Sequence, residues 1–233
     1  MYFYSILFAH LATICRFVLY CHFFNATEMK SSIIKKLLMA LSGIFLVIFL
    51  TQHLLINLTS IIPDHGKTFN AVSHFMGYNP LVQFVLQPIL MFGVCFHFIM
   101  GFVIEFSNRK NKSNYAISGI KSSWVSRNMI TTGLVILGFL FLHLYDFFIP
   151  EMDYKYISGL NANDHRYFEE LVHRFHGNLT RTILYCISFV FLGLHLLHGL
   201  SSSFQTMGLQ KRHIKAVNWI ANVYSWIIAI GFI

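Results

Sequence analysis

The sequence predicts an all-α membrane protein in which five transmembrane helices pack as a bundle. Of the 233 residues, 56% are hydrophobic and 11% are charged, whereas a soluble domain is roughly 45–50% apolar and about 25% charged. Several apolar runs reach the ~20 residues that a helix needs to cross a ~30 Å hydrocarbon layer. Both observations argue against a water-soluble fold.

The predicted spans follow one another with short polar connections. They are Leu37–Leu58, Leu81–Ile104, Met129–Ile149, Thr182–Leu200 and Val217–Ile233. Residues 1–28 form an apolar extension with Arg16 near its centre. This extension is open to three interpretations: a sixth span, an uncleaved anchor, or a stretch upstream of a true start at Met29. We assign residues 29–233 to one membrane domain.

Charged residues in the connections predict the orientation. Lys and Arg are in excess before the first span, between the second and third, and between the fourth and fifth. These connections are expected on the cytoplasmic side of a cell inner (cytoplasmic) membrane, which places the C-terminus outside. The net charge of +8 is therefore interpreted as a topology signal, and nucleic acid is not expected as a partner. The two outer connections are predicted to form short helices on the membrane surface around 69–75 and 167–173, with solvated loops as the alternative.

Histidine is the residue type that points to a function. The chain has 13 His against nine Asp and Glu, and an ionisable group inside a bilayer usually marks a functional site. One well-buried histidine is predicted in each of the first four spans: His53, His97, His143 and His195. A free-thiol chemistry is disfavoured, because the four Cys form no CxxC pair.

Depth along the helices predicts how these histidines pair. At about 1.5 Å per residue, His97 and His195 lie about 8–10 Å from the cytoplasmic ends of their spans. His53 and His143 lie about 21–24 Å from the same side. Two imidazoles on facing helices at one depth can occupy both axial positions of a haem iron. The pairs are therefore His97 with His195 and His53 with His143.

Glycines accompany the histidines at repeated intervals, and both spacings suggest room for a porphyrin beside the helix backbone. Gly101 and Gly199 follow His97 and His195 by one helical turn. Gly43 and Gly133 precede the other two histidines by the same interval, within the similar segments SGIFLVIFLTQHL and TGLVILGFLFLHL. The alternative is that the histidines join helices by hydrogen bonds and the glycines simply allow close packing.

Further polar residues are candidates for the edges of these sites. Arg127 and His198, with Lys36, are expected near the propionates of the inner haem, and Arg181, His74 and His176 near the outer one. His198 could also replace His195 as a ligand. A quinone needs hydrogen-bond donors and a protonatable group. The candidates near the outer haem are Asn57, Asn70, His74 and Asp146, although Asp146 could equally be a carboxylate at a wet helix end.

Several motifs together resemble a known family. They are IFLTQHLLIN around His53, TFNAVSHFM at 68–76, FHFIMG around His97, SRNMITTG followed by HLYDF around His143, and HLLHGLSSSFQTMG from His195. The set is similar to the single-subunit dihaem cytochrome b membrane anchor of succinate dehydrogenase and fumarate reductase. The resemblance covers most of 31–233, and residues 1–28 match no part of the family pattern.

The resemblance implies a fold, cofactors and partners. The family's axial ligands carry over onto His53, His97, His143 and His195, in the same pairs that depth predicts. The expected cofactors are two haem b, and menaquinone is the expected quinone. The expected partners are an iron–sulfur and a flavoprotein subunit on the cytoplasmic side, so no succinate chemistry is expected in this chain. The alternatives are a dihaem anchor of a hydrogenase or formate dehydrogenase, and a haem-free structural anchor.

Overall fold

The structure is a computed structural model that describes residues 32–110, 128–159, 163, 165–208 and 210–233. All of its regular elements within these residues are helical, as the sequence predicts. The long helices are α2 (Ser32–Leu58), α4 (Gln87–Lys110), α7 (Met129–His143), α10 (Leu179–Thr206) and α11 (Gln210–Phe232). The predictions for residues 1–28 lie outside the described residues.

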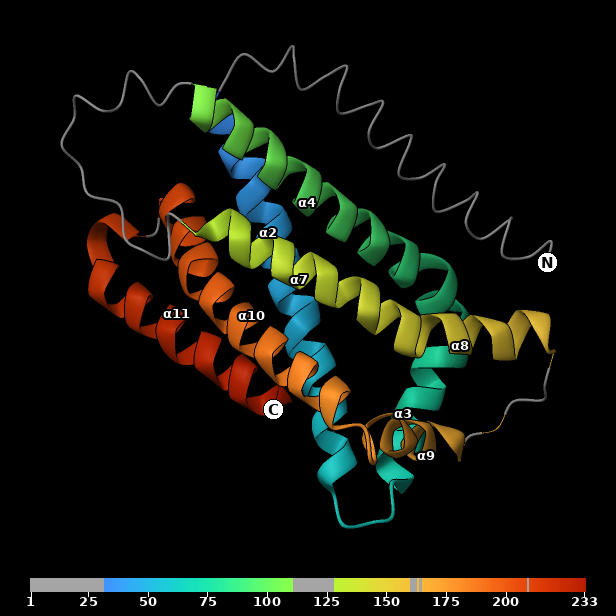
Figure 1. Ribbon diagram of the computed structural model, residues 1–233. Helices are drawn as coiled ribbons and strands as arrows, with labels where there is room; N and C mark the ends of the chain where they lie inside the picture. Colours follow the sequence, from blue (N-terminus) through green and yellow to red (C-terminus); the bar gives the residue numbers. More distant parts are fainter. Residues whose placement is uncertain (1–31, 111–127, 160–162, 164, 209) are drawn as a thin grey trace.

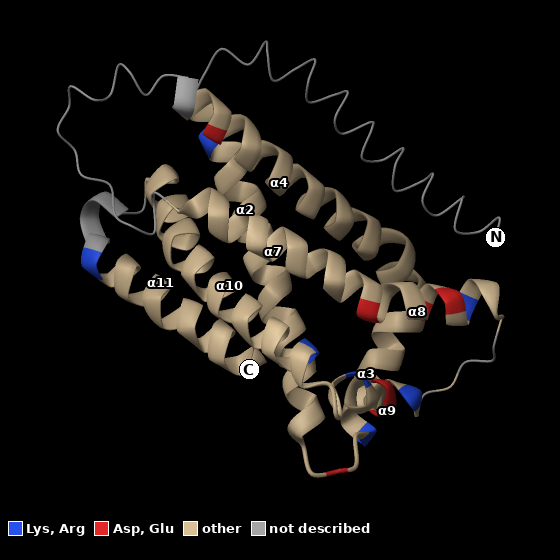
Figure 2. Cartoon of the chain, viewed as in Figure 1, with Lys and Arg blue, Asp and Glu red and all other residues tan. Residues whose placement is uncertain are grey.

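Four helical segments are long and apolar enough to cross a membrane: Ile33–Ile61, Val82–Asn108, Met129–Ile157 and Leu179–Thr206. Each extends past its predicted span at one end or both, because a helix can continue through the polar residues at which an apolar run stops. The fifth predicted span is helical in α11 but is not among these four. Its apolar sequence contains Asn218 and Asn222, and Lys215 comes shortly before it in the same helix. Figure 2 shows charged residues gathered at the helix ends.

Four helices form a ring, and α11 covers one side of it. Helix α2 packs against α4 and α10, and α7 packs against the same two helices (Figure 1). Helix α11 packs mainly on α10 and also contacts α2. The ring therefore has two diagonals, one between α2 and α7 and one between α4 and α10.

Prolines interrupt two of the long segments, and a π-helical turn precedes each proline. The turn η2 (Val82–Leu86) lies before Pro88, and the turn η4 (Leu144–Phe148) lies before Pro150. Proline has no backbone N–H to donate to the preceding turn, and π-turns often absorb such a break. The chain remains helical from α7 through η4, α8 (Ile149–Met152) and η5 (Asp153–Ile157).

Two short helices pack together across one end of the ring. They are α3 (Lys67–Tyr78) and α9 (Arg166–Phe175), which confirms that both predicted surface segments are helical. The Asn70 side chain joins them, because its amide donates to the carbonyl of His165 at 3.1 Å and accepts from the N–H of Phe168 at 2.8 Å. Gly66, at φ 76°, approaches Phe168 so closely that a Cβ would collide with its ring.

A buried ion network ties α9 to the end of the third long segment. Arg166 is 7% exposed and pairs with Glu151 and, at 2.7 Å, with Glu170. Lys155 pairs with Glu151 at 2.6 Å. Burial lowers the pKa of Arg166, but its hydrogen bonds to both glutamates outweigh that effect and hold the pKa above its usual value. Burial, and then Glu151, raises the pKa of Tyr167 in the same network, so this phenol stays neutral.

Candidate functional site

The structure brings the four predicted histidines together in two pairs. The ring centroids of His53 and His143 are 5.7 Å apart, with an interplanar angle of 82°. The ring centroids of His97 and His195 are 6.4 Å apart, with an angle of 71°. Each pair joins two helices that face each other across a diagonal of the ring, so all four imidazoles point into its interior.

The two pairs lie at different levels along the bundle. Ser42 on α2 contacts His97, and Thr132 on α7 contacts His195. Each of these residues lies 11 positions before the histidine of the other pair on its own helix. At 1.5 Å per residue the two levels are about 16 Å apart. The levels and partners are those that depth predicts from the sequence.

Hydroxyl groups contact the His97–His195 pair. The Oγ atom of Ser42 lies 3.1 Å from Nδ1 of His97, and the Oγ1 atom of Thr132 lies 3.1 Å from Nδ1 of His195. The Nε2 atoms of these two histidines make no hydrogen bond to any residue within the described ranges. His198 contributes no ring contact to the pair in this part of the chain, so His195 is the partner of His97.

Aromatic side chains surround the His53–His143 pair. A phenylalanine four residues earlier stacks on each ring, with centroid distances of 5.6 Å for Phe49 and His53 and 5.8 Å for Phe139 and His143. Phe147, Tyr185 and Phe232 complete the enclosure. The Nδ1 atom of His143 is buried without a hydrogen-bond partner, and the Asn57 amide lies 3.4 Å from Nε2 of His53.

The spacing of both pairs fits a haem iron held between two imidazoles. With a metal–nitrogen bond of about 2 Å and a ring radius of about 1 Å, the two centroids should be about 6 Å apart. The observed separations are 5.7 and 6.4 Å. Two protein ligands suit a metal whose other ligands come from a macrocycle.

Protein packing does not explain the four predicted glycines. A Cβ on Gly43 or Gly133 would come no closer than 3.5 Å or 3.6 Å to a neighbour, in each case a histidine ring. A Cβ on Gly101 or Gly199 would meet only a flexible methionine methyl, at 3.7 or 3.3 Å. By contrast, a Cβ on Gly193 would lie 2.9 Å from Ala229 Cβ, where α10 and α11 pack closely.

The candidates for propionate binding are scattered. Arg127 lies outside the described residues. His198 is half-buried on α10 close to His195, and Lys36 is exposed near the start of α2. Arg181 is paired with Asp146, and His176 is exposed on the rim of a pocket between α9 and α10.

No hydrogen bond joins any two of the four quinone candidates in the described part of the chain. Asn57 donates to the carbonyl of His53 at 2.8 Å. Asn70 is occupied in joining α3 to α9. His74 stacks on Tyr78 with a centroid distance of 4.6 Å, and its Nδ1 atom is buried without a hydrogen-bond partner.

Asp146 is buried instead of lying at a wet helix end. It is 1% exposed in the π-turn after His143. Its Oδ1 atom lies 3.2 Å from the guanidinium of Arg181, and its Oδ2 atom accepts a hydrogen bond from Tyr185 at 2.8 Å. The Tyr185 ring also contacts His143, with centroids 6.4 Å apart. This group therefore links α7 to α10 beside the His53–His143 pair.

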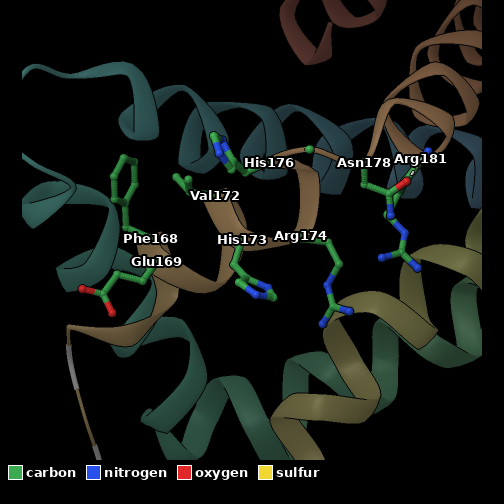
Figure 3. A pocket seen from close by; sticks show the side chains of 9 residues that line it. Phe168, Glu169, Val172, His173, Arg174, His176, Asn178 and Arg181 are labelled. Carbon is green, nitrogen blue, oxygen red and sulfur yellow. Dashed lines mark hydrogen bonds between the residues drawn. The ribbon is translucent and has the colours of Figure 1, made fainter.

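A pocket of about 700 Å³ opens between α9 and the start of α10 (Figure 3). Its lining includes Phe168 and Val172 on the apolar side and Arg174 and Arg181 on the basic side. Figure 3 shows both arginine side chains extending toward α7. Arg181 thus connects the pocket to the buried carboxylate of Asp146.

No role for Ser42, Thr132, Met39 or Met129 is predicted from the sequence. Both hydroxyls also contact a methionine carbonyl three residues earlier, at 2.9 Å. The shared pattern Met-x-x-Ser/Thr-Gly, at 39–43 and 129–133, is the sequence signal for this arrangement.

Comparisons of the chain with known protein families, with characterised proteins and with solved structures give no match.

We expect Arg181→Ala to destabilise the fold, because it leaves the Asp146 carboxylate buried without a cation. Breaking a buried pair on one side costs about 3–5 kcal/mol. The double variant Asp146→Asn/Arg181→Ala should recover most of this loss, since a neutral amide still accepts from Tyr185. The free energy of unfolding in detergent measures both.

Arg174→Ala is the matched control, because Arg174 lines the same pocket and makes no ion pair or hydrogen bond to a described residue. It should change stability by no more than about 0.5 kcal/mol. Equal losses for Arg174→Ala and Arg181→Ala would contradict a stabilising Asp146–Arg181 pair.

Proposed function

We propose that this chain is the dihaem cytochrome b membrane-anchor subunit of a succinate:quinone oxidoreductase, passing electrons between an iron–sulfur subunit and membrane quinone. The observation that carries the proposal is the presence of two imidazole pairs inside the bundle, each across a diagonal of a four-helix ring, at levels about 16 Å apart. When bound, two haem b groups would supply one-electron redox chemistry at these levels.

The chain's own residues would hold and insulate these groups. His97 and His195 would bind one iron, and His53 and His143 the other. Phenylalanines and Tyr185 enclose the second pair. In a low-dielectric interior, burial and hydrogen bonds to the ligands tune a haem potential.

The unexplained glycines support a bound macrocycle. A glycine inside a helix costs about 1 kcal/mol relative to alanine. Gly43, Gly101, Gly133 and Gly199 have no close protein neighbour that requires them. A flat group lying against the helix backbone at those positions is a reason for the missing side chains.

The choice of partners rests on the sequence motifs. The resemblance around TFNAVSHFM and the four histidines favours flavoprotein and iron–sulfur subunits over those of a hydrogenase or formate dehydrogenase. The distribution of Lys and Arg supports an orientation in which the His97–His195 level is nearer the cytoplasm, where those subunits would deliver or accept electrons. The His53–His143 level then lies nearer the outer face, beneath α3 and α9, and menaquinone is the proposed quinone.

Single His→Ala substitutions at positions 53, 97, 143 and 195 test the haem assignment. Each should remove about half of the b-type pigment, because loss of one axial ligand releases one haem and leaves the other pair intact. A reduced-minus-oxidised spectrum and the haem content per protein are the measurements. His198→Ala should keep both haems. A wild-type protein without b-type absorbance would contradict the haem assignment.

Gly133→Ala should weaken haem retention at the His97–His195 site and stabilise the haem-free protein by up to about 1 kcal/mol. Its control on the same helix is Gly138→Ala, because Gly138 has no atom within 4 Å of a Cβ position. Haem content and the thermal midpoint of haem-depleted protein are measured. Equal haem content in the two variants would contradict a macrocycle at Gly133.

Purification of the tagged chain from its native membrane tests the complex. We expect a flavin-containing and an iron–sulfur subunit to co-purify in equal amounts, with succinate reducing the haems. Recovery with hydrogenase or formate dehydrogenase subunits, or alone with haem bound, would overturn the succinate assignment and leave the haem assignment standing.

A further inference from the structure

We infer that Ser42 and Thr132 are positioning residues that lock His97 and His195 in the tautomer carrying hydrogen on Nδ1, so that the Nε2 lone pair is free to bind a metal. The inference deepens the proposed function and rests on it for the identity of the metal group. The tautomers themselves follow from hydrogen-bond donors and acceptors within this chain.

The Ser42 hydroxyl determines the protonation of His97. A serine hydroxyl has one hydrogen to donate. The Oγ–H of Ser42 donates it to the carbonyl of Met39 at 2.9 Å. The 3.1 Å contact between Oγ and Nδ1 of His97 must therefore be donated by the imidazole. A neutral His97 with hydrogen on Nδ1 carries an unprotonated Nε2.

Thr132 repeats the same arrangement on another helix. Its Oγ1–H donates to the carbonyl of Met129 at 2.9 Å, so the 3.1 Å contact with His195 again requires a hydrogen on Nδ1. Thr132 is 2% exposed and Ser42 is 9% exposed, so little water reaches either hydroxyl. Helices α2 and α7 thus each present a hydroxyl oxygen as the acceptor for a histidine on a neighbouring helix.

This hydrogen-bond pattern is typical of metal-binding histidines. Such residues nearly always donate their second ring N–H to an acceptor, which fixes the ring orientation and makes the metal-binding nitrogen more basic. Here each acceptor is anchored to its own helix backbone by a second hydrogen bond. Both Nε2 atoms make no hydrogen bond to a described residue, so they remain available.

Among the described residues, hydroxyl groups contact Nδ1 of the paired histidines only at the His97–His195 level. The Nδ1 atom of His143 is buried without a hydrogen-bond partner, and His53 has an amide instead of a hydroxyl near its ring, at Nε2. The two sites therefore offer a metal chemically different ligand pairs. A more basic imidazole favours ferric iron, so removing either hydroxyl should raise the potential of the haem at the His97–His195 level and leave the other unchanged.

The test uses the complete membrane complex carrying Ser42→Ala or Thr132→Val. We expect haem content to be kept and the ferric-to-ferrous ratio of the His97–His195 haem, at a fixed potential, to fall about threefold to tenfold. That change corresponds to a rise of about 30–60 mV for a one-electron couple. Redox titration in the presence and absence of His143→Ala assigns the shifted haem.

Conservative and matched variants separate positioning from packing. Ser42→Thr and Thr132→Ser retain the hydroxyl and should restore the wild-type potential. Ser188→Ala is the matched control, because Ser188 is a buried hydroxyl that donates to its own helix, at the carbonyl of Leu184, and does not contact a histidine. Equal shifts in Ser188→Ala and Ser42→Ala, or no shift with haem retained, would overturn the inference.

Nitrogen NMR of histidine-labelled full-length protein tests the tautomers directly, including in haem-depleted samples. We expect hydrogen on Nδ1 of both His97 and His195, with a mixture of tautomers for the affected residue in each hydroxyl variant. Hydrogen on Nε2 of either residue in the wild type would refute the lock. A wild-type complex that never contains haem would refute the proposed function instead, and the NMR result would still decide the tautomers.

Discussion

The rest of this structure depends on four imidazoles that meet in pairs inside an apolar ring of helices. A polar atom in such an interior is costly without a hydrogen bond, and Nδ1 of His143 has none within the described residues. Each histidine meets its partner across a diagonal, His53 with His143 and His97 with His195, while neighbouring helices supply the direct packing. The diagonal contacts therefore set the distance between opposite helices and create two sites within one bundle.

An internal repeat makes helices α2 and α7 each contribute to both histidine pairs. Helix α2 carries His53 at one level and Ser42 at the other, and α7 carries His143 and Thr132 in the same order. Each of these helices thus provides a ring to one pair and a hydroxyl to the other. Rotating either helix would disturb both sites together, which explains why Met-x-x-Ser/Thr-Gly recurs at a constant distance from histidine.

The end of the bundle that carries α3 and α9 encloses the His53–His143 level with paired polar groups. Asn70 satisfies backbone groups of α9, Arg166 is shared between two glutamates, and Asp146 is held by Arg181 and Tyr185. A charge inside a protein is tolerated when it is paired with an opposite charge. This end therefore closes the bundle without leaving Asp146 or Arg166 as isolated charges.

The sequence by itself determined the helices, the depth of each histidine and their pairs, because hydropathy and the helical rise are local properties that need no knowledge of neighbours. It did not determine which other residues contact one another across the helices. The contact of Ser42 with His97, the packing of α3 on α9 and the burial of Asp146 against Arg181 depend on how each helix is rotated about its axis. That rotation follows from packing between segments far apart in the chain, and only the tertiary structure decides it.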